Sequence, residues 1–367
     1  MALSKVDLAN QVENQLPQNL VANNLPFRNI IINGDMSIAQ RGTSETGITG
    51  SGYNTVDRFG STIATAGTWT QSQSTDVPTG QGFATSLKYD CTTANASLSA
   101  SSQIRIQQAI EGQNLQYLKY GTANAQSTTL SFWVKSNKIG TYIIQLLNGA
   151  VSRQVGKPYT INTADTWEKK TITFPGDTSS SLDNNNSVGL YVIFCLGTGT
   201  DRSSGTLQET WSSFVSANQF AGQTVNLADS TSNYINITGV QLEAGTTASD
   251  FEFLPVDVNL QRCLRYYNEI NEANNSTTFI AGAHDGTNGT AICPYMFPVS
   301  MRAAPTVSYT GTFNCYVASA GTNKSDLGIQ TGTRGLRTLA SSVTGANGYA
   351  VHIDFAAGAK IHLSAEL

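Results

Sequence analysis

Apolar and polar residues alternate with a period of two over most of this chain, and this pattern constrains its fold more than any other feature. Clear examples lie in TLSFWVKSN (129–137), TWEKKTITFPG (166–176) and NYINITGVQLEAG (233–245). A period of two sends successive side chains to opposite faces of a strand, so that one face can be buried. Gly, Asn and Ser break the segments as turn residues do. The pattern predicts an all-β fold, an antiparallel β-sandwich of the jelly-roll type, for residues 27–254.

Two further segments fit this sandwich. GTYIIQLLNG (140–149) follows the first example after a short turn, so the two are predicted to form a hairpin. SVGLYVIFCLGTG (187–199) is almost continuously apolar, which is typical of a strand buried on both faces. No βαβ alternation occurs, and this disfavours a doubly wound nucleotide-binding fold.

The segment FRNIIINGDMSIAQRG (27–42) opens the predicted sandwich. Ile30–Ile32 are predicted to form its first strand, and Asn33–Asp35 a bend that redirects the chain. In that setting, Asp35 is better explained as a turn residue or cation ligand than as a catalytic acid or base.

A short helix is predicted near the N-terminus, within a segment comprising residues 1–26. Its apolar stripe consists of Leu8, Val12 and Leu16, and Pro17 ends it. So short a helix is marginal alone, and we therefore interpret the segment as an anchor that docks on another protein or on its own copies. A frayed tail is the alternative.

The alternation stops in PVDVNLQRCLRYYNEI (255–270), where apolar residues fall on one helical face. We predict a helical linker over residues 255–270, followed by a smaller C-terminal β-domain over residues 271–367. The alternating Val351, Ile353 and Phe355, and then Ile361 and Leu363, predict a final hairpin.

Charge and cysteine usage limit the partners. Charged residues are 13% of the chain and its net charge is −4, so binding of nucleic acid through electrostatics is not expected. No apolar run approaches the roughly 20 residues that span a bilayer, so no membrane insertion is expected. No secretory signal is visible at the N-terminus. The five cysteines are predicted to be buried thiols, although a Cys293–Cys315 disulfide stays open.

Motifs of catalysis are missing from the sequence. It contains three histidines, of which His352 and His362 lie in neighbouring predicted strands but have no third metal ligand nearby in the sequence. No GxSxG, HExxH or GxxxxGK[ST] pattern occurs. We therefore predict no catalytic residues and no enzyme. The alternative is a glycan hydrolase built on paired carboxylates. Its candidates are Asp35, Asp57, Glu111, Asp165, Glu168, Asp250 and Glu252.

Sugar binding needs exposed aromatic rings with polar neighbours. Trp211, in LQETWSSFVSANQF, is the best candidate, unless it serves to pin this insertion onto the sandwich. Trp69 and Tyr53 are weaker candidates. Trp133 and Trp167 lie within alternating strands and are predicted to be in the core.

The chain resembles bacteriophage tail-fibre or receptor-binding proteins with a jelly roll like that of carbohydrate-binding modules. The resemblance covers most of the chain, in order. It is carried by NIIINGDMSIAQRG, TVDRF, LSFWVKS, NITGVQLEAGTTASDFE, LQRCLRYY and FPVSMRAAPTV. It implies a virion structural protein on the particle surface, most simply a homotrimeric tail fibre or spike. Such an adhesin docks on other virion proteins by its N-terminus and contacts host surface glycans.

The resemblance leaves two other functions open, a head decoration protein that stabilises the particle and a glycan-degrading spike. It also implies one cofactor. Jelly rolls of this kind often hold a structural Ca²⁺ near their first and last strands, and Asp35 and Asp250 are its candidate ligands here.

Overall fold

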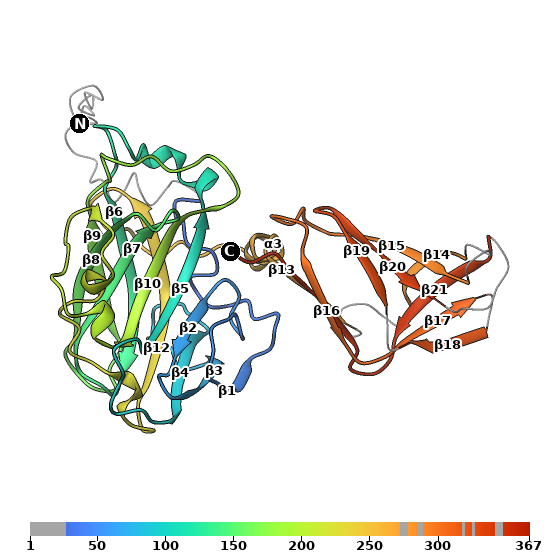
Figure 1. Cartoon of the computed structure of the whole chain (residues 1–367), viewed down its shortest axis with the longest axis horizontal. Coiled ribbons are helices and arrows are strands. Elements are labelled where there is room, and N and C mark those ends of the chain that lie inside the picture. Colours follow the sequence, from blue (N-terminus) through green and yellow to red (C-terminus); the bar gives the residue numbers. More distant parts are fainter. Residues whose placement is uncertain (1–26, 272–277, 285–288, 318–319, 325–326, 342–347) are drawn as a thin grey trace, which may run out of the picture. The chain divides into compact units, whose positions relative to one another are not determined.

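The chain forms two compact units, which a computed structural model describes over residues 27–271, 278–284, 289–317, 320–324, 327–341 and 348–367. Unit 1 ends at Pro255 and unit 2 begins at Val256. In Figure 1 the strands of unit 1 are coloured blue to yellow and those of unit 2 orange to red. The predicted anchor helix with Leu8, Val12 and Leu16 lies outside the described residues.

Unit 1 is an antiparallel β-sandwich of two six-stranded sheets, which confirms the predicted fold class. Sheet A has the order β1-β3-β4-β12-β6-β9, and sheet B the order β11-β8-β7-β10-β5-β2. The strands of sheet A are β1 (Ser44–Ile48), β3 (Thr68–Ser74), β4 (Ser86–Thr93), β12 (Tyr234–Ala244), β6 (Thr128–Ser136) and β9 (Glu168–Phe174). The strands of sheet B are β11 (Ser212–Ser213), β8 (Arg153–Ile161), β7 (Gly140–Asn148), β10 (Val188–Thr198), β5 (Gln103–Glu111) and β2 (Gly60–Ala64).

Alternation in the strands builds the core between the two sheets. Leu130, Phe132 and Val134 of β6 are fully buried there. Phe132 meets Phe194 of β10 edge to face, with ring centroids 5.2 Å apart. Because β6 belongs to sheet A and β10 to sheet B, this contact joins the two layers.

The opening segment is buried as predicted, but it is not a strand. Ile30–Ile32 have bent, irregular backbone, and side-chain amides satisfy it. The amide oxygen of Asn29 accepts hydrogen bonds from the backbone N–H of both Ile31 and Leu242, at 3.0 and 3.1 Å. The side chain of Gln108 bonds both the N–H and the C=O of Ile32, at 2.8 and 2.9 Å. The predicted first strand was therefore wrong, because a buried backbone can be satisfied by side chains as well as by a neighbouring strand.

The bend at Asn33–Asp35 requires glycine in its middle. The carbonyl of Gly34 accepts a hydrogen bond of 2.9 Å from the N–H of Val240. A Cβ atom at Gly34 would lie 2.0 Å from the carbonyl oxygen of Val240, far inside van der Waals contact. The glycine thus permits the opening segment to lie directly on β12.

Unit 2 contains helix α3 (Val256–Leu264) and two antiparallel sheets. The three-stranded sheet has the order β13 (Tyr267–Asn271), β22 (Lys360–Ser364), β16 (Thr306–Thr310). The seven-stranded sheet has the order β18 (Ala320–Lys324), β17 (Phe313–Val317), β21 (Ala350–Phe355), β14 (Thr278–His284), β15 (Ala291–Met296), β20 (Gly335–Ala340), β19 (Gly328–Thr331). A smaller C-terminal β-domain is thereby confirmed.

Two predictions for unit 2 were wrong in detail. The helix ends at Leu264, and the last residues of the predicted linker form β13, which pairs with β22. The predicted final hairpin does not form either, since β21 and β22 belong to different sheets. Alternation specifies which face of a strand is buried, but not which strand is its neighbour.

All five cysteines are buried thiols, so Cys293 and Cys315 are not joined in a disulfide. Within the described residues, the structure contains no helix with the length and apolar character required to cross a membrane.

We expect Gly34→Ala to destabilise unit 1 by about 1–3 kcal/mol, because the new methyl group overpacks a buried contact. All four tryptophans lie in unit 1, so urea unfolding followed by their fluorescence reports on this unit. Gly50→Ala is the control, since nothing lies within 4 Å of its added Cβ. Equal midpoints for the two variants would contradict the close approach of Gly34 to β12.

Candidate functional site

A recess of about 270 Å³ lies on the outer face of sheet B, and we call it the sheet B pocket. Its floor comes from the central strands β5, β7 and β10, and its wall from the connection between β10 and β12, residues 199–233. The lining residues are Arg105, Gln107, Leu147, Val151, Tyr191, Ile193, Arg202, Phe214, Ser216 and Gln219.

The register of β10 determines which side chains form the floor. Leu190, Val192 and Phe194 point into the sandwich core. The alternate residues, Tyr191 and Ile193, therefore lie on the outer face. The sequence predicted a strand buried on both faces, and the structure confirms it.

The wall is held down by a second apolar cluster on that outer face. Phe220 is fully buried there, with Leu207 and Phe214 packed beside it. The cluster's strand residues are Ile143, Leu147, Ile193 and Cys195. A chain of amides adds to it: Gln219 donates to the side-chain oxygen of Gln145 at 3.4 Å, and Gln145 donates to Gln154 at 2.8 Å. The wall is therefore a packed part of unit 1.

Two arginines, Arg105 and Arg202, line the pocket. The lining contains no Asp or Glu. The Nε of Arg105 is buried and has no hydrogen-bond partner in the part of the chain that the structure describes, whereas Arg202 donates to the carbonyl of Ser101 at 3.2 Å. Burial, and then the nearby charge of Arg202, lowers the pKa of Arg105. An unsatisfied buried donor typically costs about 1–3 kcal/mol, so a stable fold retains it at the expense of stability.

The aromatic residues proposed from sequence lie elsewhere. The indole N–H of Trp211 donates to the carbonyl of Pro175 at 2.7 Å, and its ring meets Tyr120 edge to face at 5.7 Å. Trp211 thus pins the β10–β12 connection onto the sandwich, as the alternative interpretation held. Its neighbour Phe214, in the same insertion, is the aromatic residue that lines the pocket.

Trp69 is fully buried, whereas Tyr53 is only partly buried. Trp69 has 0% exposure and donates to the carbonyl of Ala66, so this prediction was wrong. Tyr53 is half-buried, with the guanidinium of Arg41 5.5 Å from its ring centre. It does not line the sheet B pocket.

A smaller recess of about 190 Å³ lies on the outer face of sheet A. Its lining includes Trp133 and several phenylalanine rings, together with the polar residues Gln81, Lys169 and Asp250. Trp133 is half-buried on this face, and Trp167 is half-buried with its N–H bonded to Asp76. Both were predicted to lie in the core, and both predictions were wrong. Trp133 alternates with the inward residues Phe132 and Val134 of β6 and therefore points outward, and Trp167 lies just before β9.

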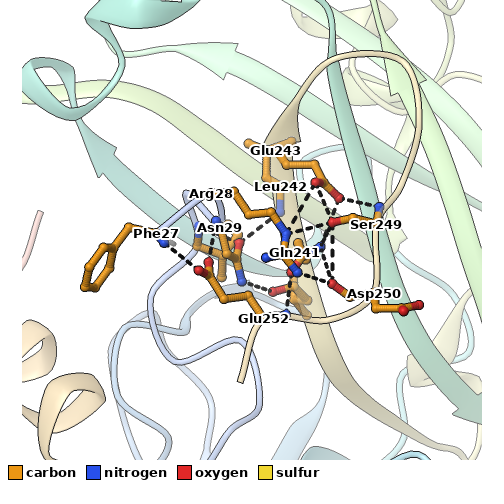
Figure 2. Close-up of polar contacts among 11 residues, drawn as sticks. Phe27, Arg28, Asn29, Gln241, Leu242, Glu243, Ser249, Asp250 and Glu252 are labelled. Carbon is orange, nitrogen blue, oxygen red and sulfur yellow. Dashed lines mark hydrogen bonds and ion pairs between the residues drawn. The ribbon is translucent and has the colours of Figure 1, made fainter. Parts of the chain in front are cut away.

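The Ca²⁺ site predicted at Asp35 and Asp250 stays a prediction. Ca²⁺ takes about 6–8 oxygen ligands, several of them carboxylate. The carboxylate of Asp35 accepts from the hydroxyl of Ser37, and Asp250 is exposed and uses its backbone carbonyl in the network of Figure 2. Among the residues the structure describes, no three His, Cys, Asp or Glu side chains form a group suited to a metal ion.

A guanidinium, that of Arg28, supplies positive charge where the opening segment meets β12. Glu243, 3% exposed, accepts hydrogen bonds from the N–H and hydroxyl of Ser249 at 2.9 and 2.7 Å. Figure 2 shows the side chain of Arg28 directed toward these two residues, with its Nε 3.8 Å from the carboxylate. Arg28 also donates to the carbonyl of Asp250, and so joins the opening segment to the end of β12.

The other carboxylates considered for catalysis make structural contacts. Asp57 accepts from the backbone N–H of Gln40, Glu111 from Gln113, Asp165 from Tyr234, and Glu252 from the N–H of Asn29. Glu168 accepts from Asn162, Thr163 and Lys170. Burial alone would raise its pKa, but these hydrogen bonds outweigh burial and lower the pKa to about 2. Glu168 is thus ionised near neutral pH, the wrong state for a general acid.

Comparisons with known proteins find similar solved structures but no matching family. No protein-family model and no curated protein matches the chain. The similar solved structures include the enzymatically active domain of tailspike protein 4 of bacteriophage CBA120, at 13% identity and a TM-score of 0.33. That match covers 60% of this chain but only 22% of the tailspike chain.

Carbohydrate-binding modules also occur among the matches. A xylan-binding domain of family 22 shares 13% identity, with 56% of this chain and 97% of that chain covered and a TM-score of 0.28. A family 11 module from Clostridium thermocellum, in complex with a mixed-linked tetrasaccharide, shares 11% identity, with 56% and 98% covered and a TM-score of 0.26. These scores are too low to support an inference about this chain.

We expect unit 1 to lose stability in acid partly through Glu168. A carboxylate with a lowered folded pKa stabilises the fold fully above its ordinary value of 4.5 and loses this contribution as the pH falls toward 2. Melting followed by tryptophan fluorescence at pH 7, 5 and 3 should show a smaller acid-induced fall in Tm for Glu168→Gln than for the natural protein. Glu45→Gln, at an exposed position of β1, is the control. Identical pH profiles for Glu168→Gln and the natural protein would refute this role.

We expect Arg28→Ala to destabilise unit 1 by about 1–3 kcal/mol, because it leaves the buried carboxylate of Glu243 without its cation. Adding Glu243→Gln should restore part of that loss, since the uncompensated charge is then gone. Urea unfolding followed by tryptophan fluorescence measures both effects. Lys157→Ala, which breaks a pair with the 58% exposed Glu209, is the control and should change stability by less than about 1 kcal/mol.

Proposed function

We propose that this chain is a phage virion adhesin and that unit 1 binds glycans of the host surface through the sheet B pocket. The observation that carries the proposal is the composition of this pocket. It places an aromatic ring, Tyr191, among the side chains of two arginines, two glutamines and a serine.

This combination suits a sugar ring. The C–H face of a pyranose is apolar and packs on a flat aromatic side chain, whereas its hydroxyl groups need hydrogen-bond donors and acceptors. Gln107 offers both donors and acceptors, and the arginines offer donors. The volume of about 270 Å³ is just below the roughly 300–1,000 Å³ typical of pockets for drug-sized ligands, and is suited to one sugar residue of a longer chain.

We propose binding without cleavage. Glycoside hydrolysis usually requires two carboxyl groups about 5–10 Å apart across the scissile bond. The lining of the sheet B pocket includes no carboxylate, and Asp57, Glu111 and Glu168 are hydrogen-bonded elsewhere in the fold. This supports an adhesin over a glycan-degrading spike.

The virion part of the proposal is supported by the ordered motifs that resemble phage fibre proteins. Within it, residues 1–26 dock on another virion protein, the chain assembles as a homotrimer, and the protein sits on the particle surface at the tail. The low share of charged residues, 13%, agrees with a β-protein exposed on a particle. A decoration protein of the head is the other position consistent with these motifs.

The test is binding of the full chain to an array of bacterial surface polysaccharides. We expect Tyr191→Ala to weaken binding about tenfold, because a stacked ring contributes about 1–1.5 kcal/mol. Trp133→Ala removes an aromatic side chain from the recess on sheet A and should leave binding unchanged. Loss of binding in Trp133→Ala alone would move the site to sheet A, and an array without any bound polysaccharide would refute glycan binding.

A further inference from the structure

We propose that the glycan taken by the sheet B pocket is anionic, and that Arg105 and Arg202 hold a carboxylate or phosphate group of the sugar. This inference rests on the proposed glycan binding and names the chemical class of its ligand. Carboxylate and phosphate are both oxyanions with several acceptor oxygens.

The two arginines reach the pocket from different parts of the fold. Arg105 lies on β5 in the floor, opposite Cys195 of β10. Arg202 ends the short 3-10 helix η3 (Thr200–Arg202) in the wall. A ligand in the pocket therefore lies within reach of positive charge from both the sheet and the connection that covers it.

Their hydrogen bonding within the protein is sparse. A guanidinium has five N–H donors. Within the part of the chain that the structure describes, the side chain of Arg202 bonds one carbonyl, that of Ser101, and the buried Nε of Arg105 bonds nothing. Beyond the bond to Ser101, the donors of Arg202 are thus available to an acceptor that enters the pocket, and the guanidinium-bearing side chain of Arg105 lines the same pocket.

None of the ion pairs among the described residues involves these two arginines, in contrast to three other arginines of unit 1. Arg28, Arg41 and Arg153 lie 3.8, 3.6 and 2.6 Å from the carboxylates of Glu243, Asp57 and Asp177. These distances show how the fold neutralises a guanidinium that has only a structural role. Arg105 is half-buried without such a partner, and the lining of its pocket contains no acidic side chain.

An anionic sugar would supply both hydrogen-bond acceptors and a negative charge to the two arginines. The planar fork of arginine matches the geometry of carboxylate and phosphate, so one group can accept two parallel hydrogen bonds. Burial and the charge of Arg202 lower the pKa of Arg105, which shows that the site disfavours the positive charge in the absence of a ligand. A neutral sugar would accept hydrogen bonds but would leave the two charges unbalanced.

Titration calorimetry of the full chain with three polysaccharides tests the inference: polygalacturonate carries carboxylates, a ribitol-phosphate teichoic acid carries phosphates, and dextran is neutral. We expect binding of at least one anionic polymer, no measurable binding of dextran, and weaker binding as NaCl rises from ~50 to ~500 mM. The polygalacturonate and teichoic acid arms distinguish a carboxylate ligand from a phosphate ligand.

Substitutions then locate the contact. Arg105→Gln and Arg202→Gln should each weaken binding about 10–100-fold, as expected for charge-assisted hydrogen bonds. Arg105→Lys should recover part of the affinity, because it keeps the charge but loses the fork. Lys169→Gln, which removes the same charge from the recess on sheet A, should leave binding unchanged.

A stability measurement separates a ligand contact from a structural role. Because Arg105 has a buried donor without a partner, Arg105→Gln should melt at the same temperature as the natural protein or higher when followed by tryptophan fluorescence. A lower Tm would show that Arg105 supports the fold and would overturn the inference.

Two further outcomes would refute either the anionic ligand alone or both proposals. If dextran or other neutral glycans bind as well as the anionic ones, and Arg105→Gln does not weaken binding, the anionic ligand is wrong while glycan binding stands. If neither these polymers nor the bacterial polysaccharides of the array bind, both proposals are wrong.

Discussion

Strand β10 is apolar on both faces, and the rest of unit 1 is built around it. Its inward residues, among them Phe194, meet sheet A and close the sandwich core. Its outward residues Ile193 and Cys195 give the β10–β12 connection an apolar surface on which to pack. Without that second cluster the connection would be a long surface loop, and sheet B would be left without the wall that makes its outer face into a pocket.

Burial of polar groups follows two different rules in this unit. Where the chain closes on itself, Asn29, Gln108 and Arg28 satisfy buried backbone and a buried carboxylate, so each polar group has a partner. In the sheet B pocket, Arg105 has a buried donor without one. A buried polar atom without a partner is not confined to the pocket, because the amide oxygen of Gln103 and the hydroxyl of Tyr159 also have none among the described residues. What distinguishes Arg105 is its place in the lining of a recess that also contains Arg202 and no acidic side chain.

The sequence supported the fold class well and the site poorly, for identifiable reasons. Alternation over 129–137 or 233–245 is local, so β6 and β12 could be predicted within one residue at each end. The pairing of β21 and β22 with other strands, and the irregular backbone of Ile30–Ile32, depend on contacts between residues far apart in the chain. Neither leaves a local pattern.

The sheet B pocket also depends on contacts between residues far apart in the chain, which the sequence does not reveal. The sequence singled out the insertion around Trp211, and part of this insertion lines the sheet B pocket. Which of its aromatic residues faces the pocket depends on contacts such as the hydrogen bond from Trp211 to Pro175. The proximity of Arg105 to Arg202 is even more difficult to predict from the sequence. It depends both on the register of β5 against β10 and on the path of the β10–β12 connection. A single arginine in an alternating strand is typical of a solvated face. Only the three-dimensional arrangement, with a second arginine and no acidic side chain in the lining of the same recess, sets Arg105 apart from such a residue.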